Sequence, residues 1–177
     1  MRIAGILAVA WLLDMVVGDP QGFPHPIRFI GWMISRGESL LRRILPGHPF
    51  AGGMILTAVV TGVSAGLTWL VLAGLARIHP WVALAGETVL CAQILATRSL
   101  RDESHRVLRS LLRGDLPAAR KYLSWIVGRD TQTMEEEAIS RAVVETVAEN
   151  TTDGVIAPLL FMMIGGAPLG MFYKAAN

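Results

Sequence analysis

Apolar and polar residues are arranged along this chain in long blocks. Four blocks are almost entirely apolar and long enough to form membrane-spanning helices, at about residues 1–17, 53–76, 81–97 and 154–172. The segment Arg77-Ile-His-Pro80 is so short that it predicts a tight helical hairpin between the second and third blocks. The first block resembles a signal peptide, but its small residues at Ala8-Val-Ala10 come too early for cleavage, and we expect an anchor. The pattern predicts an all-α, polytopic integral membrane protein with about four spanning helices, folded as a single membrane domain over residues 1–177.

Two polar segments, at about residues 18–52 and 98–153, separate these blocks. The first begins with a proline-rich stretch, residues 19–26, that cannot be helical. Residues 27–45 then repeat apolar positions at helical spacing with arginines between them. This pattern predicts an amphipathic helix that lies at the membrane interface.

The second polar segment is expected to contain three helices. The first is expected to run from Arg98 to Arg113 and to end at Gly114. Asp115 is placed to cap the second, which we expect to end near Gly128. Thr133 and Glu136 have the spacing of a capping box at the start of the third helix. Together these helices predict a helical cytoplasmic layer.

The composition agrees with a membrane protein, since 53% of the residues are hydrophobic, 17% are charged and the mean hydropathy is +0.49. Lysine is almost absent and no long basic run occurs, so we expect no nucleic-acid partner. Cys91 is the single cysteine, which excludes an intramolecular disulfide and a cysteine-based zinc site.

The basic residues predict an orientation. Both polar segments are rich in arginine, and only Arg2, Arg77 and Lys174 remain for the opposite side. By the positive-inside rule both polar segments lie in the cytoplasm, and the N-terminus and the Arg77 hairpin lie outside. We therefore expect a multi-pass protein of the cell (inner) membrane whose active site is on the cytoplasmic face.

A narrow charged stripe precedes the last apolar block. Arg141, Glu145 and Glu149 fall on one side of a helix whose other positions are mainly apolar, so we expect this stripe to face a polar cavity. Asn150 to Gly154 is expected to break the helix and to gather Asp153 with the two glutamates. Desolvating this much negative charge without a cation or an arginine would cost several kcal/mol, so the cluster indicates a divalent cation site.

The polar residues that follow the third apolar block allow two interpretations. Arg98, Arg101, Asp102 and Glu103 either begin a solvated helix whose arginines face phospholipid, or form a site for an anion and a metal.

Three acidic residues and a histidine near the apolar blocks are also ambiguous. Asp14, Asp19 and His25 either end a helix in a rigid proline loop or contribute to a site. A carboxylate in the last turn of a span usually contacts protein or a water-filled cavity, which slightly favours a site for Asp14. Glu87 is either a buried partner of an arginine or of Gln93, or a catalytic residue.

Several short motifs occur in the order and with the spacing of the adenosylcobinamide-phosphate synthase family, which the chain resembles nearly from end to end. They are Gly18-Asp-Pro20, Pro24-His-Pro26, Ser99-Leu-Arg-Asp-Glu-Ser104, Gly128-Arg-Asp-Thr131, Val144-Glu-Thr-Val-Ala-Glu-Asn150, Asp153-Gly154, Ala157-Pro158 and Tyr173-Lys-Ala-Ala-Asn177.

The resemblance implies a membrane enzyme of late cobalamin biosynthesis, a carbon-nitrogen ligase. Such an enzyme attaches aminopropanol, or its O-phosphate, to adenosylcobyric acid by an amide bond at the expense of ATP, with Mg²⁺ as the expected metal. A carboxylate is a poor electrophile, so the expected route is an acyl phosphate that the amine attacks. Membrane lipid and other membrane enzymes of the late pathway are the further partners that it implies.

The candidate residues take roles in this reaction as follows. Glu145, Glu149 and Asp153 are the expected metal ligands, because Mg²⁺ prefers oxygen. Arg98, Arg101 and Arg141 are expected to hold ATP or aminopropanol phosphate, with Asn150 as a further cofactor contact. His25, Asp102 and Glu103 are candidates for a second metal contact or for the base that deprotonates the amine. The chain has no Gly-x-x-x-x-Gly-Lys motif, so nucleotide would bind in another geometry.

Family members continue beyond the Tyr173-Lys-Ala-Ala-Asn177 motif, so the resemblance implies that the C-terminal part is lacking and that this chain alone binds substrates poorly.

Two other functions compete with the ligase. One is a sensor or accessory protein related to a signalling branch of cell-wall recycling, and the charged motifs argue against it. The other is a small transporter with Asp14 and Glu87 as ion-binding residues, although most polar groups lie at the membrane boundary.

Overall fold

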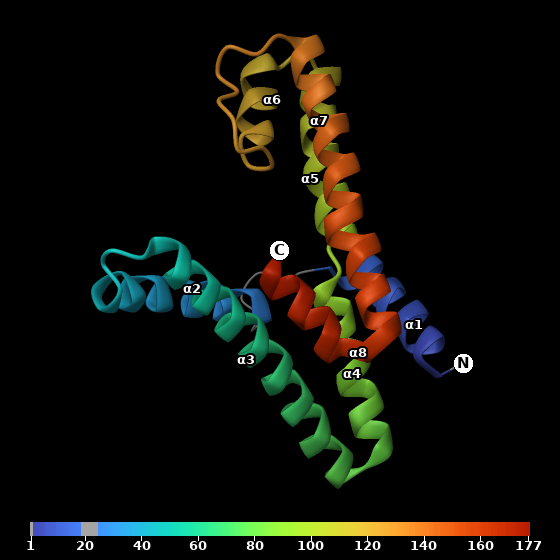
Figure 1. Cartoon of the computed structure of the whole chain (residues 1–177). Coiled ribbons are helices and arrows are strands. Elements are labelled where there is room, and N and C mark those ends of the chain that lie inside the picture. Colours follow the sequence, from blue (N-terminus) through green and yellow to red (C-terminus); the bar gives the residue numbers. More distant parts are fainter. Residues whose placement is uncertain (1, 19–24) are drawn as a thin grey trace.

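The computed structural model describes residues 2–18 and 25–177, and every regular element in these ranges is helical (Figure 1), which confirms the all-α class. Asp19 lies outside the described residues. In chain order the elements are α1 (Arg2–Val17), α2 (Pro26–Ile44), α3 (Pro49–Ile78), α4 (Pro80–Ile94), α5 (Thr97–Leu112), α6 (Leu116–Leu123), α7 (Glu136–Thr151), the π-helix η1 (Thr152–Ile156) and α8 (Ala157–Ala176).

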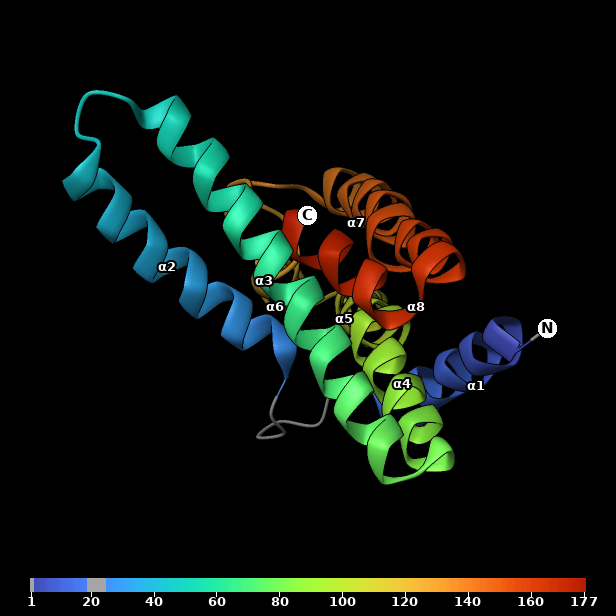
Figure 2. The ribbon, with the colours of Figure 1, turned by 60° about the horizontal axis from the view of Figure 1, so that its bottom comes forward.

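An apolar bundle forms the lower part of the molecule, where α8 packs against α3 and α4, and α4 also packs against α1. Its core contains Ala10, Cys91, Ile94 and Met162, which are completely buried. The predicted hairpin between α3 and α4 is confirmed, since His79 alone separates the two helices and caps α4 by accepting a hydrogen bond from Trp81 N at 3.2 Å. Figure 2 shows the hairpin and the crossing of α3 by α8 from below.

Three helical stretches of the described chain are long and apolar enough to cross a membrane, namely Pro49–Ile78, Pro80–Leu112 and Glu136–Ala176. The first apolar block forms α1, which has 16 residues and is therefore about 24 Å long, somewhat short of a hydrocarbon core of about 30 Å. Its outer face is apolar, since Leu12 and Val16 are exposed. That α1 is a full span therefore stays a prediction.

The last apolar block forms α8, which is bent within its length. Gly165 and Gly166 leave the helical conformation, with φ/ψ of −138°/22° and 63°/−161°. The second half of α8 folds back against the first, because the ring centroids of Phe161 and Tyr173 are 4.8 Å apart and Gly170 lies against the side chain of Met162. The glycine pair therefore makes a sharp bend, although such a pair would also suit close helix packing. After the bend, the C-terminal part of α8 returns toward α3 (Figure 1).

The predicted amphipathic helix is confirmed as α2. His25 caps it, since its Nδ1 accepts a hydrogen bond from Ile27 N at 3.3 Å, and Pro26 occupies the first turn, where no N–H is needed. The face of α2 that carries Ile30 packs on α3, and Gly37 gives room for the side chain of Leu56.

The predicted polar layer is confirmed as three helices, α5, α6 and α7, which rise above the bundle in Figure 1. A second apolar core holds them together, in which Val107, Leu123, Ile139 and Ala142 are completely buried. This core is separate from the core of the bundle, so the layer has its own packing.

Two expected boundaries in this layer are wrong. α6 ends at Leu123 and not near Gly128. α7 begins at Glu136 without a side-chain cap, so Thr133 and Glu136 form no capping box. The preceding loop is fixed instead by Arg120, whose Nε donates to Met134 O at 2.8 Å and whose carbonyl accepts from Thr131 Oγ1 at 2.9 Å. These tertiary hydrogen bonds set the start of α7.

The predicted cap at Asp115 is confirmed, since its Oδ1 accepts a hydrogen bond from Ala118 N at 3.0 Å. Substitution Asp115→Ala should destabilise the layer by about 1 kcal/mol, because an exposed N-cap contributes about that much. Thermal unfolding of the purified protein followed by circular dichroism measures the loss. No change, or a loss of several kcal/mol, would contradict this estimate.

Candidate functional site

The candidate site is built around the joint between α4 and α5, where Leu95 and Ala96 interrupt the helix. Ala96 N donates a hydrogen bond to Gly154 O at 3.1 Å, and a Cβ on Gly154 would lie 3.4 Å from Ala96 Cβ. The Asp153-Gly154 motif therefore meets the chain directly before the Ser99-Leu-Arg-Asp-Glu-Ser104 motif.

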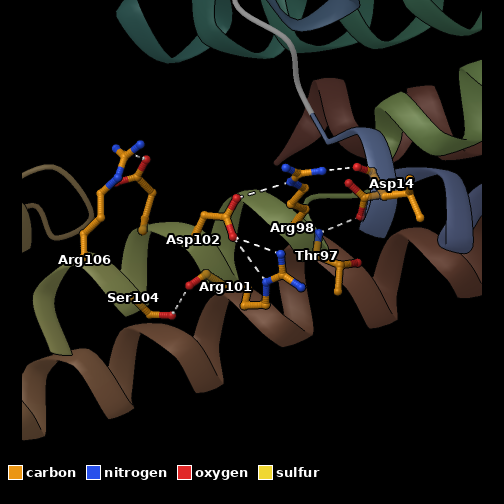
Figure 3. A network of polar contacts seen from close by, with 9 residues as sticks. Asp14, Thr97, Arg98, Arg101, Asp102, Ser104 and Arg106 are labelled. Carbon is orange, nitrogen blue, oxygen red and sulfur yellow. Dashed lines mark hydrogen bonds and ion pairs between the residues drawn. The ribbon is translucent and has the colours of Figure 1, made fainter. Parts of the chain in front are cut away.

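Asp14 connects the end of α1 to the same joint (Figure 3). Its Oδ2 accepts a hydrogen bond from Thr97 N at 2.8 Å, and only 2% of the residue is exposed. Ala96, at the N-cap of α5, offers no side-chain acceptor, so Asp14 caps α5 from another helix. Asp14 thus contacts protein at this position, and its carboxylate is favourably placed at the positive end of the α5 dipole.

Arg98 makes the opposite connection, from α5 back to the end of α1. Its Nη1 donates to Val16 O, and its Nε donates to Asp102 Oδ2 at 3.3 Å. Gly18 has a φ of 62°, and a Cβ at this position would lie 2.6 Å from Arg98 Cδ. Glycine is therefore required both by the backbone conformation and by the arginine stem. The first residue of the Gly18-Asp-Pro20 motif thus packs on a predicted site residue 80 positions away.

Arg98 and Arg101 share one carboxylate, that of Asp102. Arg101 Nε and Nη2 donate to Asp102 Oδ1 at 3.2 and 3.1 Å (Figure 3). Burial raises the pKa of Asp102, but the hydrogen bonds and the positive charges of Arg101 and Arg98 together outweigh burial and hold this pKa below its usual range. Asp102 is thus a weak base at neutral pH, and it orients two guanidinium groups that remain partly exposed.

The other two candidates for the base, Glu103 and His25, are engaged in different ways. Glu103 pairs with Arg106 at 2.8 Å, while its other oxygen, Oε2, is buried and has no hydrogen-bond partner among the described residues. His25 lies at the start of α2, with Nδ1 used as the helix cap. Of the two carboxylates among the candidates, that of Glu103 has an oxygen without a hydrogen-bond partner among the described residues, whereas both oxygens of Asp102 are bonded to arginine.

The charged stripe on α7 faces outward and not into a cavity, contrary to the prediction. Arg141, Glu145 and Glu149 are exposed, whereas Ala142 and Thr146 face the neighbouring helices. Arg141 Nη2 lies 3.1 Å from Glu137 Oε1, and Glu145 Oε2 lies 2.8 Å from Arg129 Nη2. The reason is that α7 must bury its small apolar side chains in the polar layer, which turns the stripe to the opposite side.

The expected helix break after Asn150 is also wrong. Helix α7 continues through Thr151 into the π-helix Thr152–Ile156, and α8 follows directly. Asn150 bonds back to Thr146 O at 2.9 Å. A π-helix turn inserts an extra residue without ending the helix, and such turns are frequent at functional sites. Here it carries Asp153 and presents Gly154 to the α4–α5 joint.

The described residues contain no group of three or more Asp, Glu, His or Cys side chains that could hold a metal ion. The expected ligands Glu145, Glu149 and Asp153 are therefore not assembled into a metal centre, and Glu145 is engaged by Arg129. Glu149 and Asp153 lie four residues apart at the junction of α7 and η1. Two carboxylates fit an ion such as Mg²⁺, which takes one or two from protein and completes its shell with water and phosphate.

The structure thus places Arg98, Arg101, Asp102 and Glu103 on the first turns of α5, directly after the joint where Ala96 bonds to Gly154, and it leaves Arg141 apart from them. Arg141 is ten residues from Thr151 along α7, or about 15 Å. The cross-chain cap by Asp14 and the packing of Gly18 on Arg98 were not predicted. The glycine of the Gly18-Asp-Pro20 motif was the available signal, because a glycine directly after an apolar helix often has a positive φ.

An apolar groove of about 510 Å³ runs between α5 and α7 above this cluster. Leu108, Val144 and Val147 line it, and Ser104 and His105 lie at its polar end. The groove follows the helix pair upward from the two arginines, so an extended ligand held by them would have apolar surface to contact.

Comparison with known proteins supports the motif pattern. The family described as CobD/Cbib protein matches residues 7–177. Cobalamin biosynthesis protein CbiB of Salmonella typhimurium is 49% identical over 171 residues, which are 96% of this chain and 54% of that relative. Cobalamin biosynthesis protein CobD is 49% identical in Citrobacter koseri and in Geobacter metallireducens, with the chain again covering 54% of each. The chain therefore spans about half the length of these relatives, and no solved structure matches it.

Proposed function

The chain belongs to the CobD/CbiB family, and from this premise we propose that it takes part in cobalamin biosynthesis as the arginine-bearing part of an ATP-dependent amide ligase. The proposed substrates are adenosylcobyric acid and aminopropanol or its O-phosphate. The relatives are longer than this chain, so the proposed enzyme includes the remaining length of a CobD/CbiB protein.

One observation carries the proposal, namely the pair Arg98 and Arg101 held by Asp102 at a joint where three motifs meet. Guanidinium groups bind phosphate in a forked, bidentate geometry, and these two keep exposed surface while one carboxylate fixes their direction. Such a pair suits an anionic substrate, either the phosphates of ATP or the phosphate of the amine. Arg141 is proposed to contact a more distant part of the bound substrates.

The reaction needs an activated carboxyl group and a neutral amine. In the proposed route, the substrate carboxylate attacks the γ-phosphorus of ATP, ADP leaves, and the amine displaces phosphate from the acyl phosphate. Arg98 and Arg101 would hold the phosphates in line, and Glu103 is the preferred base for the ammonium proton because its Oε2 is not engaged. Asp102 is better suited to orienting the arginines, since its pKa is lowered.

Magnesium, bound with the nucleotide, would neutralise the phosphate charge during transfer. Glu149 and Asp153 are the residues proposed to hold it, with Asn150 beside them as a further cofactor contact. We propose that all of these groups lie on the cytoplasmic face, because the positive-inside rule places both arginine-rich segments there.

The test is formation of the amide product in detergent, with ATP, Mg²⁺, adenosylcobyric acid and aminopropanol phosphate. The chain is assayed alone and with the remaining part of a relative supplied as a second polypeptide. Substitution Glu149→Gln should lower turnover at least tenfold, because it removes a negative ligand without changing the shape of the side chain. Substitution Glu136→Gln is the matched control, since Glu136 is an exposed glutamate in the first turn of the same helix.

Product that needs both polypeptides and is lost in the Glu149→Gln protein would support the ligase and the metal contact together. Product that is equally lost in the Glu136→Gln protein would point to general damage to α7. A folded protein that forms no product and binds no nucleotide in either combination would overturn the ligase, and it would favour the alternative of a membrane sensor or accessory protein.

A further inference from the structure

A second cavity lies far from the candidate site, at the turn between α2 and α3. Its volume is about 310 Å³, and its floor is formed by Leu41, Leu45 and Leu56 together with the backbone of Gly52 and Gly53. Gly53 leaves this space open, since nothing lies within 4 Å of a Cβ placed on it. A cavity with such a floor suits a hydrocarbon group.

The rim of the cavity is polar and mainly basic. Arg42 and His48 line it, and Glu38 is the acidic residue that faces them. Arg42 bonds Glu38 Oε1 through Nε and Nη2 at 2.9 and 2.7 Å, and this ion pair is exposed on both sides. An exposed pair of this kind is weak, so Arg42 can turn toward a stronger anion.

The charge of α2 as a whole favours an anion as well. The helix contains four arginines and one glutamate, giving a net charge of +3 from Arg28, Arg36, Arg42, Arg43 and Glu38. Phe29 and Trp32 stack at 5.9 Å and are exposed, as are Leu40 and Ile44. Aromatic and aliphatic side chains beside arginines are typical of a helix at the headgroup level of a bilayer.

The position of the cavity relative to the membrane is set by α3. This 30-residue helix is long and apolar enough to cross a bilayer, and the cavity lies at its first turn, next to Pro49. Phe50, one residue further on, is strongly exposed. The cavity therefore opens where hydrocarbon meets headgroups, with an apolar floor and a basic rim.

We propose that this cavity between α2 and α3 binds one anionic glycerophospholipid, with its phosphate at Arg42 and His48 and the start of an acyl chain over Leu41, Leu45 and Leu56. Basic pockets beside spanning helices favour anionic headgroups over zwitterionic ones. The site is independent of the proposed ligase, because none of its residues belongs to the candidate site.

The experiment counts bound lipid by native mass spectrometry and measures thermal stabilisation of the full chain in neutral detergent. Phosphatidylglycerol is compared with phosphatidylcholine of the same acyl chains and with inorganic phosphate. Substitution Gly53→Leu fills the open cavity without breaking α3, since leucine is a better helix former than glycine. Gly62→Leu is the control, because it makes the same change elsewhere in α3, at a position where nothing lies within 4 Å of a Cβ. Substitution Arg42→Ala is compared with Arg113→Ala, which removes an exposed arginine at the end of α5.

We expect phosphatidylglycerol to bind at least tenfold more tightly than phosphatidylcholine. The Gly53→Leu protein should lose this binding, and the Arg42→Ala protein should weaken it about fivefold, while both control proteins keep it. Equal binding of the two lipids, or equal binding by the variant and control proteins, would overturn the proposal. Competition by inorganic phosphate at similar concentration would also overturn it, since that result would indicate a site for a free anion.

Discussion

Substitution Asp14→Ala is expected to destabilise the protein by about 2–3 kcal/mol and to lower any amide ligase activity at least tenfold. The buried carboxylate of Asp14 is the only acceptor that the structure gives for Thr97 N in the described chain, at 2.8 Å. Loss of a buried, charge-assisted hydrogen bond costs about 1.5–3 kcal/mol, and an N-cap alone contributes about 0.5–2 kcal/mol. The activity should fall because Arg98 is the next residue of α5, and its direction depends on this first turn.

One measurement and one control variant separate this effect from general instability. Amide hydrogen exchange should increase at the start of α5 in the Asp14→Ala protein and remain unchanged in α3. Asp115→Ala is the matched control, because Asp115 makes the same kind of cap at an exposed position, with a distance of 3.0 Å to Ala118 N. If both proteins lost the same small amount of stability and kept activity, Asp14 would be an ordinary cap without influence on Arg98.

Substitution Gly166→Ala is expected to destabilise the bundle by about 2–4 kcal/mol. Gly166 has φ 63° and ψ −161°, a region that only glycine populates readily, and other residues lose about 1–3 kcal/mol there. A Cβ would also lie 2.7 Å from Glu87 Oε1. Glu87 cannot move freely, because its side chain is only 15% exposed and its Oε2 lies 3.4 Å from Arg2 Nη2. The bend of α8 and the return of Tyr173 toward Phe161 should be lost together.

Thermal unfolding in detergent, followed by near-ultraviolet circular dichroism of the aromatic residues, measures this change. Gly62→Ala in α3 is the control, since no atom lies within 4 Å of its Cβ and alanine is the better helix former, so it should be neutral or slightly stabilising. Adding Glu87→Ala to the Gly166→Ala protein should restore the share of the lost stability that is due to the close contact between the new Cβ and Glu87. Equal stability of the Gly166→Ala and Gly62→Ala proteins would refute the bend as a rigid feature.

Glu87 shows how a tertiary contact adds to what the sequence says of an ambiguous residue. The sequence allowed a buried partner of an arginine or of Gln93, or a catalytic residue, and the structure pairs Glu87 with Arg2 from α1 and places it beside Gly166 of α8. These three residues are separated by 85 and 79 positions, and no local pattern connects them. Glu87 of α4 therefore contacts α1 through Arg2 and lies against α8 at Gly166.

Local rules predicted much of the fold because they concern residues close in the chain. The apolar blocks, the hairpin at His79, the cap by Asp115 and the amphipathic pattern of α2 depend on hydrophobicity and on hydrogen bonds within a few residues. The rules failed where tertiary contacts were stronger. Arg120 fixed the loop before α7 and replaced the expected capping box, and packing against α5 turned the charged stripe outward.

The candidate site follows the same division. The sequence by itself determined that the protein is helical and membrane-embedded, that its arginines and carboxylates cluster in motifs, and to which family it belongs. Only the tertiary structure decided which of these groups meet, because Asp14 and Thr97, Gly18 and Arg98, and Ala96 and Gly154 are joined across 58 to 83 residues. Such pairs form because buried N–H groups and carboxylates at helix ends must find partners, and which partner is in reach depends on how the helices pack.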